Sequence, residues 1–127
     1  MLLLDTHALI WWLANDAHLS EPARNAIRTR DTTIVVSAAT VWEITTKHRI
    51  GKLPGVAALV DQLDEVVIAE GFTPLPVSLP HARRAGLLPG PHRDPFDRML
   101  IAQALAEDLR LVSNEILFES YGVRRLW

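Results

Sequence analysis

The chain alternates short, continuous apolar runs with longer segments of helical periodicity. Residues 1–4 form an apolar run, residues 33–36 form a second one after an initial Thr33, and a helical pattern follows each of them, over 6–15 and over 38–50. A continuous apolar run is typical of a strand buried on both faces, and strands joined by helical crossovers pair in parallel. The sequence therefore predicts an α/β fold, with a central parallel sheet covered by helices on both faces.

Local signals predict the remaining elements. Ser20 and Pro22 indicate the start of a helix that ends near Arg30. Further helices are expected over 54–69, 78–85, 95–109 and 115–120, further strands over 72–75, 111–112 and 123–127, and a Gly/Pro-rich loop over 86–92.

Composition indicates one folded domain over residues 1–127. With 49% hydrophobic and 22% charged residues, the chain can bury a core, which excludes a disordered polypeptide. Cysteine is absent, so any metal must be held by carboxylates, histidine or water. No apolar stretch reaches the roughly 18 residues of a membrane span, and no signal-peptide pattern is present, so a cytoplasmic location is expected. The net charge of −2 does not by itself indicate a nucleic-acid-binding protein.

Four acidic residues follow predicted strands or lie in the helices after them: Asp5, Glu43, Asp97 and Glu115. Asp5 ends the first strand and Glu115 follows the fourth, whereas Asp97 lies in the first turn of its helix and Glu43 about two turns into its own. Sites in parallel sheets lie beyond the carboxyl ends of the strands, so these side chains converge if the first and fourth strands are neighbours. Carboxylates gathered in one pocket stay ionised at neutral pH only beside a cation, and Mg²⁺ or Mn²⁺ prefer such oxygen ligands. The leading chemistry is metal-assisted hydrolysis of a phosphodiester.

Each of these acids also has a purely structural interpretation. Asp5 and Asp94 stand where helix N-caps are expected, and Asp97 and Glu115 lie in first turns, where the helix dipole favours an acid. Glu43 in mid-helix would ordinarily be solvated. Only their shared place at one edge of the sheet favours a site.

Three motifs carry a family resemblance. They are Leu-Asp-Thr-His-Ala-Leu-Ile-Trp over 4–11, a segment from Ser37 to Leu53 that includes Val-Trp-Glu-Ile, and His-Arg-Asp-Pro-Phe-Asp-Arg-Met-Leu-Ile-Ala-Gln-Ala over 92–104. Together they resemble PIN-domain ribonuclease toxins of the VapC type, over nearly the whole chain. The resemblance implies a three-layer α/β/α sandwich and a Mg²⁺- or Mn²⁺-dependent endoribonuclease that leaves a 5′-phosphate and a 3′-hydroxyl. It also implies a cognate antitoxin that blocks the site, and a homodimer.

The resemblance assigns roles residue by residue. Asp5, Glu43 and Asp97 match the acidic metal-site positions, with Asp5 and Asp97 expected to hold the metal. Glu115 stands where the family usually has Asp, and its longer side chain favours a water-mediated role. Glu43 and Glu115 would complete the metal's surroundings or accept a proton from the attacking water. Supporting positions around the metal are expected for Thr6, Asp94, Ser113 and Asn114.

Basic and aromatic residues are candidates for contacts with RNA and with a second subunit. The RNA-binding candidates are Lys47, Arg49, Arg84 and Arg93, and they belong to two basic clusters, the second of which also contains His92. Arg98, beside Asp97, is expected to pair with an acid. The tryptophans at 11, 12 and 42 could stack on bases, although core or subunit contacts are the commoner use of such residues. The helices predicted over 38–50 and 54–69, with Val41, Trp42, Leu53, Val56 and Leu59, are candidates for a dimer face.

Two alternatives remain to the nuclease. A PIN-like RNA- or protein-binding module that has lost catalysis would keep the fold, and the Glu at position 115 leaves that interpretation open. An aspartyl-phosphate enzyme is disfavoured, because no second Asp follows Asp5 at a spacing of two and no Lys follows Val112 in the next loop.

Overall fold

The computed structural model describes residues 1–127, and its centre is an all-parallel sheet of five strands in the order β3-β2-β1-β4-β5. The strands are β1 (Leu2–Leu4), β2 (Ile34–Ser37), β3 (Thr73–Leu75), β4 (Arg110–Val112) and β5 (Arg125–Leu126). The first and fourth strands are neighbours, with Leu3 opposite Leu111. This pairing is the condition on which the predicted convergence of the acids depended.

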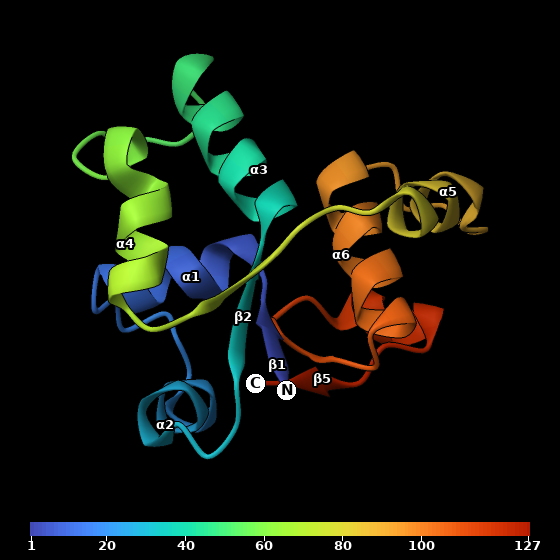
Figure 1. Cartoon of the computed structure of the whole chain (residues 1–127), viewed down its shortest axis with the longest axis horizontal. Coiled ribbons are helices and arrows are strands. Elements are labelled where there is room, and N and C mark those ends of the chain that lie inside the picture. Colours follow the sequence, from blue (N-terminus) through green and yellow to red (C-terminus); the bar gives the residue numbers. More distant parts are fainter.

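Helices cover both faces of the sheet (Figure 1). On one side lie α1 (Thr6–Leu13), α2 (Glu21–Thr29) and α4 (Leu63–Ala69), and on the other α5 (Leu79–Leu87) and α6 (Pro95–Ala106). Helix α3 (Ala38–Arg49) stands beyond the carboxyl end of the sheet and contacts both α1 and α6. Two short 3₁₀ helices, Val60–Gln62 and Ile116–Tyr121, complete the chain. The predicted α/β fold is confirmed.

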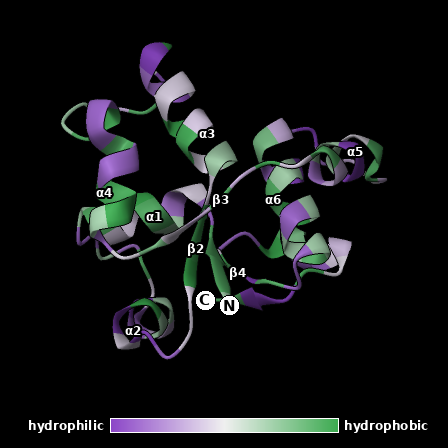
Figure 2. Ribbon diagram, viewed as in Figure 1, coloured by the Kyte–Doolittle hydropathy of each residue, from purple (hydrophilic) through white to green (hydrophobic).

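The apolar strands supply both halves of the core. Leu2 and Leu4 of β1 pack with Leu9 of α1 in one cluster, whereas Leu3 packs with Leu100 of α6 in another. This division follows from the alternation of side chains along a strand, which sends neighbouring residues to opposite faces. The ribbons of β1, β2 and β4 are correspondingly hydrophobic in Figure 2.

Side-chain caps fix where most of the helices begin. Asp5, Ser20, Ser37, Ser78 and Asp94 each accept a hydrogen bond from a backbone N–H in the first turn of the helix that follows. These bonds satisfy donors that a helix start otherwise leaves free. Asp5 directly follows β1 and Ser37 is the last residue of β2, so these two caps set where the chain turns from a strand into the next helix.

Two predicted helices are wrong in extent. The segment predicted as a helix over 54–69 is helical only from Val60, because Gly55 has a φ of +90° that a helix does not allow. The helix predicted to reach Leu109 ends at Ala106, since Asp108 adopts a φ of +52° and the N–H of Leu109 turns back to the carbonyl of Ala104. The loop predicted over 86–92 begins later, because α5 continues to Leu87.

No helix of the structure is both long enough and apolar enough to cross a membrane.

Candidate active site

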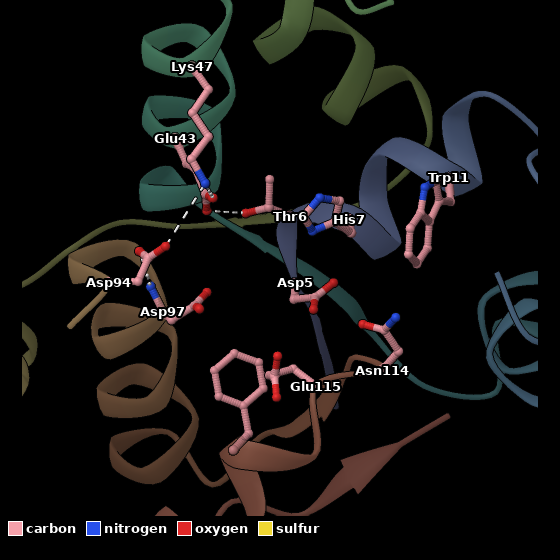
Figure 3. Close-up of a pocket in the computed structure, with 11 residues that line it drawn as sticks. Asp5, Thr6, His7, Trp11, Glu43, Lys47, Asp94, Asp97, Asn114 and Glu115 are labelled. Carbon is pink, nitrogen blue, oxygen red and sulfur yellow. Dashed lines mark hydrogen bonds and ion pairs between the residues drawn. The ribbon is translucent and has the colours of Figure 1, made fainter. Parts of the chain in front are cut away.

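A polar pocket of about 350 Å³ lies at the carboxyl ends of β1 and β4. After β1 the chain continues to β2, on one side of β1, whereas β4 pairs with β1 on its other side. The connections that follow β1 and β4 therefore run in opposite directions, and a crevice is expected between them. All four acids predicted for the site line the pocket, and Figure 3 draws them. The complete lining is Asp5, Thr6, His7, Trp11, Glu43, Lys47, Asp94, Asp97, Asn114, Glu115 and Phe118.

Asp5 is both a helix cap and a wall of this pocket. One carboxylate oxygen accepts a hydrogen bond of 2.7 Å from the N–H of Ala8 at the start of α1. Burial raises the pKa of Asp5 above its ordinary value of 3.8, and hydrogen bonds from Ser113 and Ala8 offset only part of this effect. The structural and the functional interpretations of Asp5 are therefore compatible.

Glu43 is only 3% exposed, and both of its carboxylate oxygens have partners. The hydroxyl of Thr6 donates to Oε1 at 2.5 Å, and Lys47, one turn further along α3, pairs with Oε2. Burial lowers the pKa of Lys47, but the hydrogen bond and the charge of Glu43, with Asp94 and Asp97, outweigh it and raise that pKa above 10.5. Lys47 therefore stays a cation and neutralises Glu43.

Asp97 and Asp94 come from the first turn and the cap of α6. Asp94 Oδ1 accepts hydrogen bonds from the N–H groups of Phe96 and Asp97, and its Oδ2 lies 4.0 Å from Lys47 Nζ. Burial, followed by the charges of Asp94 and Glu43, raises the pKa of Asp97 to about 7. Asp97 is thus a carboxyl group whose ionisation the pocket opposes.

His92 lies against Asp97 and was missed as a site residue by the sequence reasoning, which grouped it with surface cations. Its Nε2 is 2.9 Å from Asp97 Oδ2, an ion-pair contact without the alignment of a hydrogen bond. The loop that carries His92 is held by Tyr121, whose hydroxyl accepts from the His92 N–H. A side chain at Gly90 would collide with that hydroxyl, since an added Cβ would lie 2.6 Å from it. The one available signal was the position of His92 just before the Asp94 cap.

The loop after β4 supplies the remaining wall. Ser113 is fully buried behind Asp5 and accepts a hydrogen bond from the N–H of Glu115. Asn114 and Glu115 are exposed and line the pocket directly. Glu115 caps the second 3₁₀ helix through Oε1, which accepts from the N–H of Leu117. Its other carboxylate oxygen has no partner in the protein.

The donor set suits a hard divalent cation. No three acidic or imidazole groups are grouped closely enough to enclose an ion by themselves. Mg²⁺ does not need such a cage, because it retains several waters and is commonly held by one or two carboxylates. Asp5 and Asp97 are the carboxyl groups whose pKa values are raised, and a cation between them would remove the cost of ionising both. The residues present therefore fit Mg²⁺ or Mn²⁺.

The predicted basic contacts are dispersed. Of the four candidates, only Lys47 lines the pocket, while Arg49, Arg84 and Arg93 are exposed elsewhere on the surface. The prediction that Arg98 pairs with an acid is wrong. Its guanidinium donates instead to the backbone carbonyls of Ala85, Leu88 and His92. The reason is that the side chain leaves α6 toward the end of α5, so it closes the loop between these helices instead of reaching the pocket.

Comparison with known proteins agrees with this geometry. Residues 2–123 match the PIN domain family. Ribonuclease VapC22 of Mycobacterium tuberculosis is 32% identical over 126 residues, which is 94% of this chain and 90% of that protein. The crystal structure of VapBC2 from Rickettsia felis, bound to a DNA fragment from their promoter, superimposes with a TM-score of 0.71 at 17% identity and covers 98% of this chain and 96% of that one. A toxin–antitoxin complex from Klebsiella pneumoniae gives 0.62 at 19% identity, over 91% and 87% of the two chains. The chain belongs to the PIN-domain family, among its ribonuclease toxins of the VapC type.

Proposed function

We propose that this protein is a Mg²⁺- or Mn²⁺-dependent endoribonuclease that acts as the toxin of a toxin–antitoxin pair. Similarity to a ribonuclease supports the general activity. The metal dependence is supported by the position of Asp5 and Asp97 in one pocket, where the pKa values of both are raised. Two carboxyl groups that resist ionisation, the buried Asp5 and the half-buried Asp97, form a site that is completed by a cation.

Asp5 and Asp97 are the residues that would hold the ion. When bound, it would polarise the scissile phosphate and make water a better nucleophile. Lys47, kept protonated by Glu43, offers a further positive charge to the phosphate. Hydrolysis adds water across one P–O bond, leaving a 5′-phosphate and a 3′-hydroxyl.

The proton released by the attacking water needs an acceptor, and Glu115 suits this role better than Glu43. Both oxygens of Glu43 are engaged, by Thr6 and by Lys47. Glu115 keeps one free oxygen toward the pocket and is exposed to solvent, to which it can pass the proton. Glu43 then holds Thr6 and Lys47 in place, and Asn114 and Asp94 border the site.

The test is cleavage of total cellular RNA by the purified, antitoxin-free protein in Mg²⁺, Mn²⁺ or EDTA. Wild type should give discrete, metal-dependent products with 5′-phosphates, and Asp97→Asn should give none. Asp31→Asn, at an exposed loop position, is the matched control and should cut like wild type. A folded wild-type protein that cuts no RNA would favour the alternative of a binding module that has lost catalysis.

We further propose two protein partners. The Klebsiella pneumoniae relative was solved as a toxin–antitoxin complex, which supports an antitoxin for this chain as well. A homodimer would use the apolar groove between α3 and α6, where Trp42 is 62% exposed and meets Phe96 edge-on at 4.8 Å between ring centres. Val56, which was expected at the dimer face, is instead a buried core residue. Trp42→Ser should shift a dimer toward monomer in sedimentation velocity, and a wild-type monomer would count against this face.

A further inference from the structure

The wall of the pocket opposite Asp94 and Asp97 is aromatic. Figure 3 shows Trp11 and His7 on the α1 side, facing the acids of α6 across the hollow. The two residues are four apart on one helix and therefore share a face. Their rings lie 5.4 Å apart with an angle of 39° between the planes.

Trp11 is the centre of a larger group of rings. The imidazole of His18 stacks on the indole at 5.4 Å and 24°, and Trp127 tilts against it at 5.8 Å. His18 is held in this position by Asp16, whose carboxylate lies 2.7 Å from Nδ1. Trp11 is half-buried and packs partly against the core, but it also lines the pocket, and the two imidazoles beside it are exposed.

We infer that Trp11, with His7 and His18, forms a stacking platform for an unpaired base of the RNA, beside the phosphate that is cut. The inference rests on the proposed ribonuclease function and adds the form of RNA that the site accepts. Trp11 lies six residues after Asp5, which is about 9 Å along the helix axis. If the phosphate that is cut lies at Asp5 and Asp97, the base of a neighbouring nucleotide can reach Trp11.

The chemistry of the platform defines the substrate class. Aromatic rings stack on the faces of bases, which are available in single-stranded loops and ends but hidden in a duplex. The ring contacts described here do not read base edges, so the platform favours large bases over small ones without specifying a sequence. The site therefore takes unpaired RNA, with a purine preferred beside the cut.

Binding that does not depend on cleavage tests the platform. Anisotropy of labelled oligoadenylate, oligouridylate and an abasic ribose-phosphate chain of equal length would be measured with Asp97→Asn protein in Mg²⁺. The three probes have the same backbone charge, so differences between them report on the bases. Stacking predicts that oligoadenylate binds roughly 5- to 150-fold more tightly than the abasic chain, with oligouridylate between them.

Variants at position 11 assign that preference to the indole. In the Asp97→Asn background, Trp11→Ala should abolish the preference for oligoadenylate over the abasic chain. Trp11→Phe keeps an aromatic ring and should retain most of that preference, so it also serves if Trp11→Ala fails to fold. Trp12→Phe is the matched control, because its neighbouring indole points away and donates to Glu70 Oε2 at 3.1 Å. It should leave the preference unchanged.

Equal binding of oligoadenylate and the abasic chain, no binding of either, or a preference that survives Trp11→Ala would each overturn the platform. Failure of the proposed function is a separate result, namely wild-type protein that binds RNA but never cleaves it in Mg²⁺ or Mn²⁺.

Discussion

Replacing Asp97 with Asn should stabilise the metal-free protein at mildly alkaline pH while removing its activity. The carboxyl of Asp97 has a pKa of about 7 in the folded protein against an ordinary value of 3.8. Between these two values the folded chain binds more protons than the unfolded chain, so the free energy of unfolding falls as pH rises. Asn has no charge to lose and is free of this penalty.

The structure sets the size of the effect. A difference of about three pH units corresponds to roughly 4 kcal/mol, at 1.36 kcal/mol per unit. The side chain is 26% exposed, and solvent screens part of the repulsion, so we expect about 2–4 kcal/mol. The difference between Asp97→Asn and wild type should be near zero close to pH 4 and reach its full size near pH 8.

Urea unfolding in EDTA, followed by tryptophan fluorescence across this pH range, measures the difference. Asp31→Asn again serves as the control, because its exposed carboxyl should give the same stability as wild type at every pH. A stability difference for Asp97→Asn that does not change with pH, or a variant less stable than wild type near pH 8, would refute the electrostatic argument.

Three further outcomes are expected. Saturating Mg²⁺ or Mn²⁺ should raise the free energy of unfolding of wild type by about 2.7 kcal/mol at a hundredfold excess over Kd, but not that of Asp97→Asn, as thermal unfolding with and without the ion would reveal. Lys47→Met should cost about 3–5 kcal/mol near pH 8, because Glu43 would be left buried and unpaired, and urea unfolding should find most of that loss reversed by adding Glu43→Gln. Arg98→Met should cost roughly 2–4 kcal/mol in the same assay, since three backbone carbonyls lose a charged donor, and an unchanged midpoint would contradict that role.

The sheet could be predicted because its signals are local. Leu2–Leu4 and residues 34–36 are short, continuous apolar runs, which are typical of buried strands, and each is followed by a capped helix. The helix over 54–69 failed for a reason that periodicity cannot detect. The apolar residues from Val56 to Val67 are spaced as in a helix, but the positive φ of Gly55 makes a turn there. Val56 is buried in the core from this turn and is not part of a helix.

The acids of the site could be predicted because each follows from its place on an element. Asp5 ends a strand, Asp97 opens a helix, and the pairing of β1 with β4 brings them together. Their cationic partners could not be predicted in this way. The sequence placed Lys47 and His92 among RNA contacts, yet Lys47 pairs with Glu43 and His92 lies against Asp97. Such pairings depend on side-chain directions across separate elements.

Those partners decide where the negative charge of the pocket remains uncompensated. Glu43 is neutralised by Lys47. One carboxylate oxygen of Asp94 accepts hydrogen bonds from the first turn of α6, and the other faces Lys47. Glu115 is open to solvent. Burial raises the pKa values of both Asp5 and Asp97, and they stay raised because Asp5 has no cationic side chain in contact and His92 offsets only part of the repulsion on Asp97. The residual charge thus lies on the two carboxyl groups at the junction of β1 and α6, which is where a divalent ion would gain most by binding.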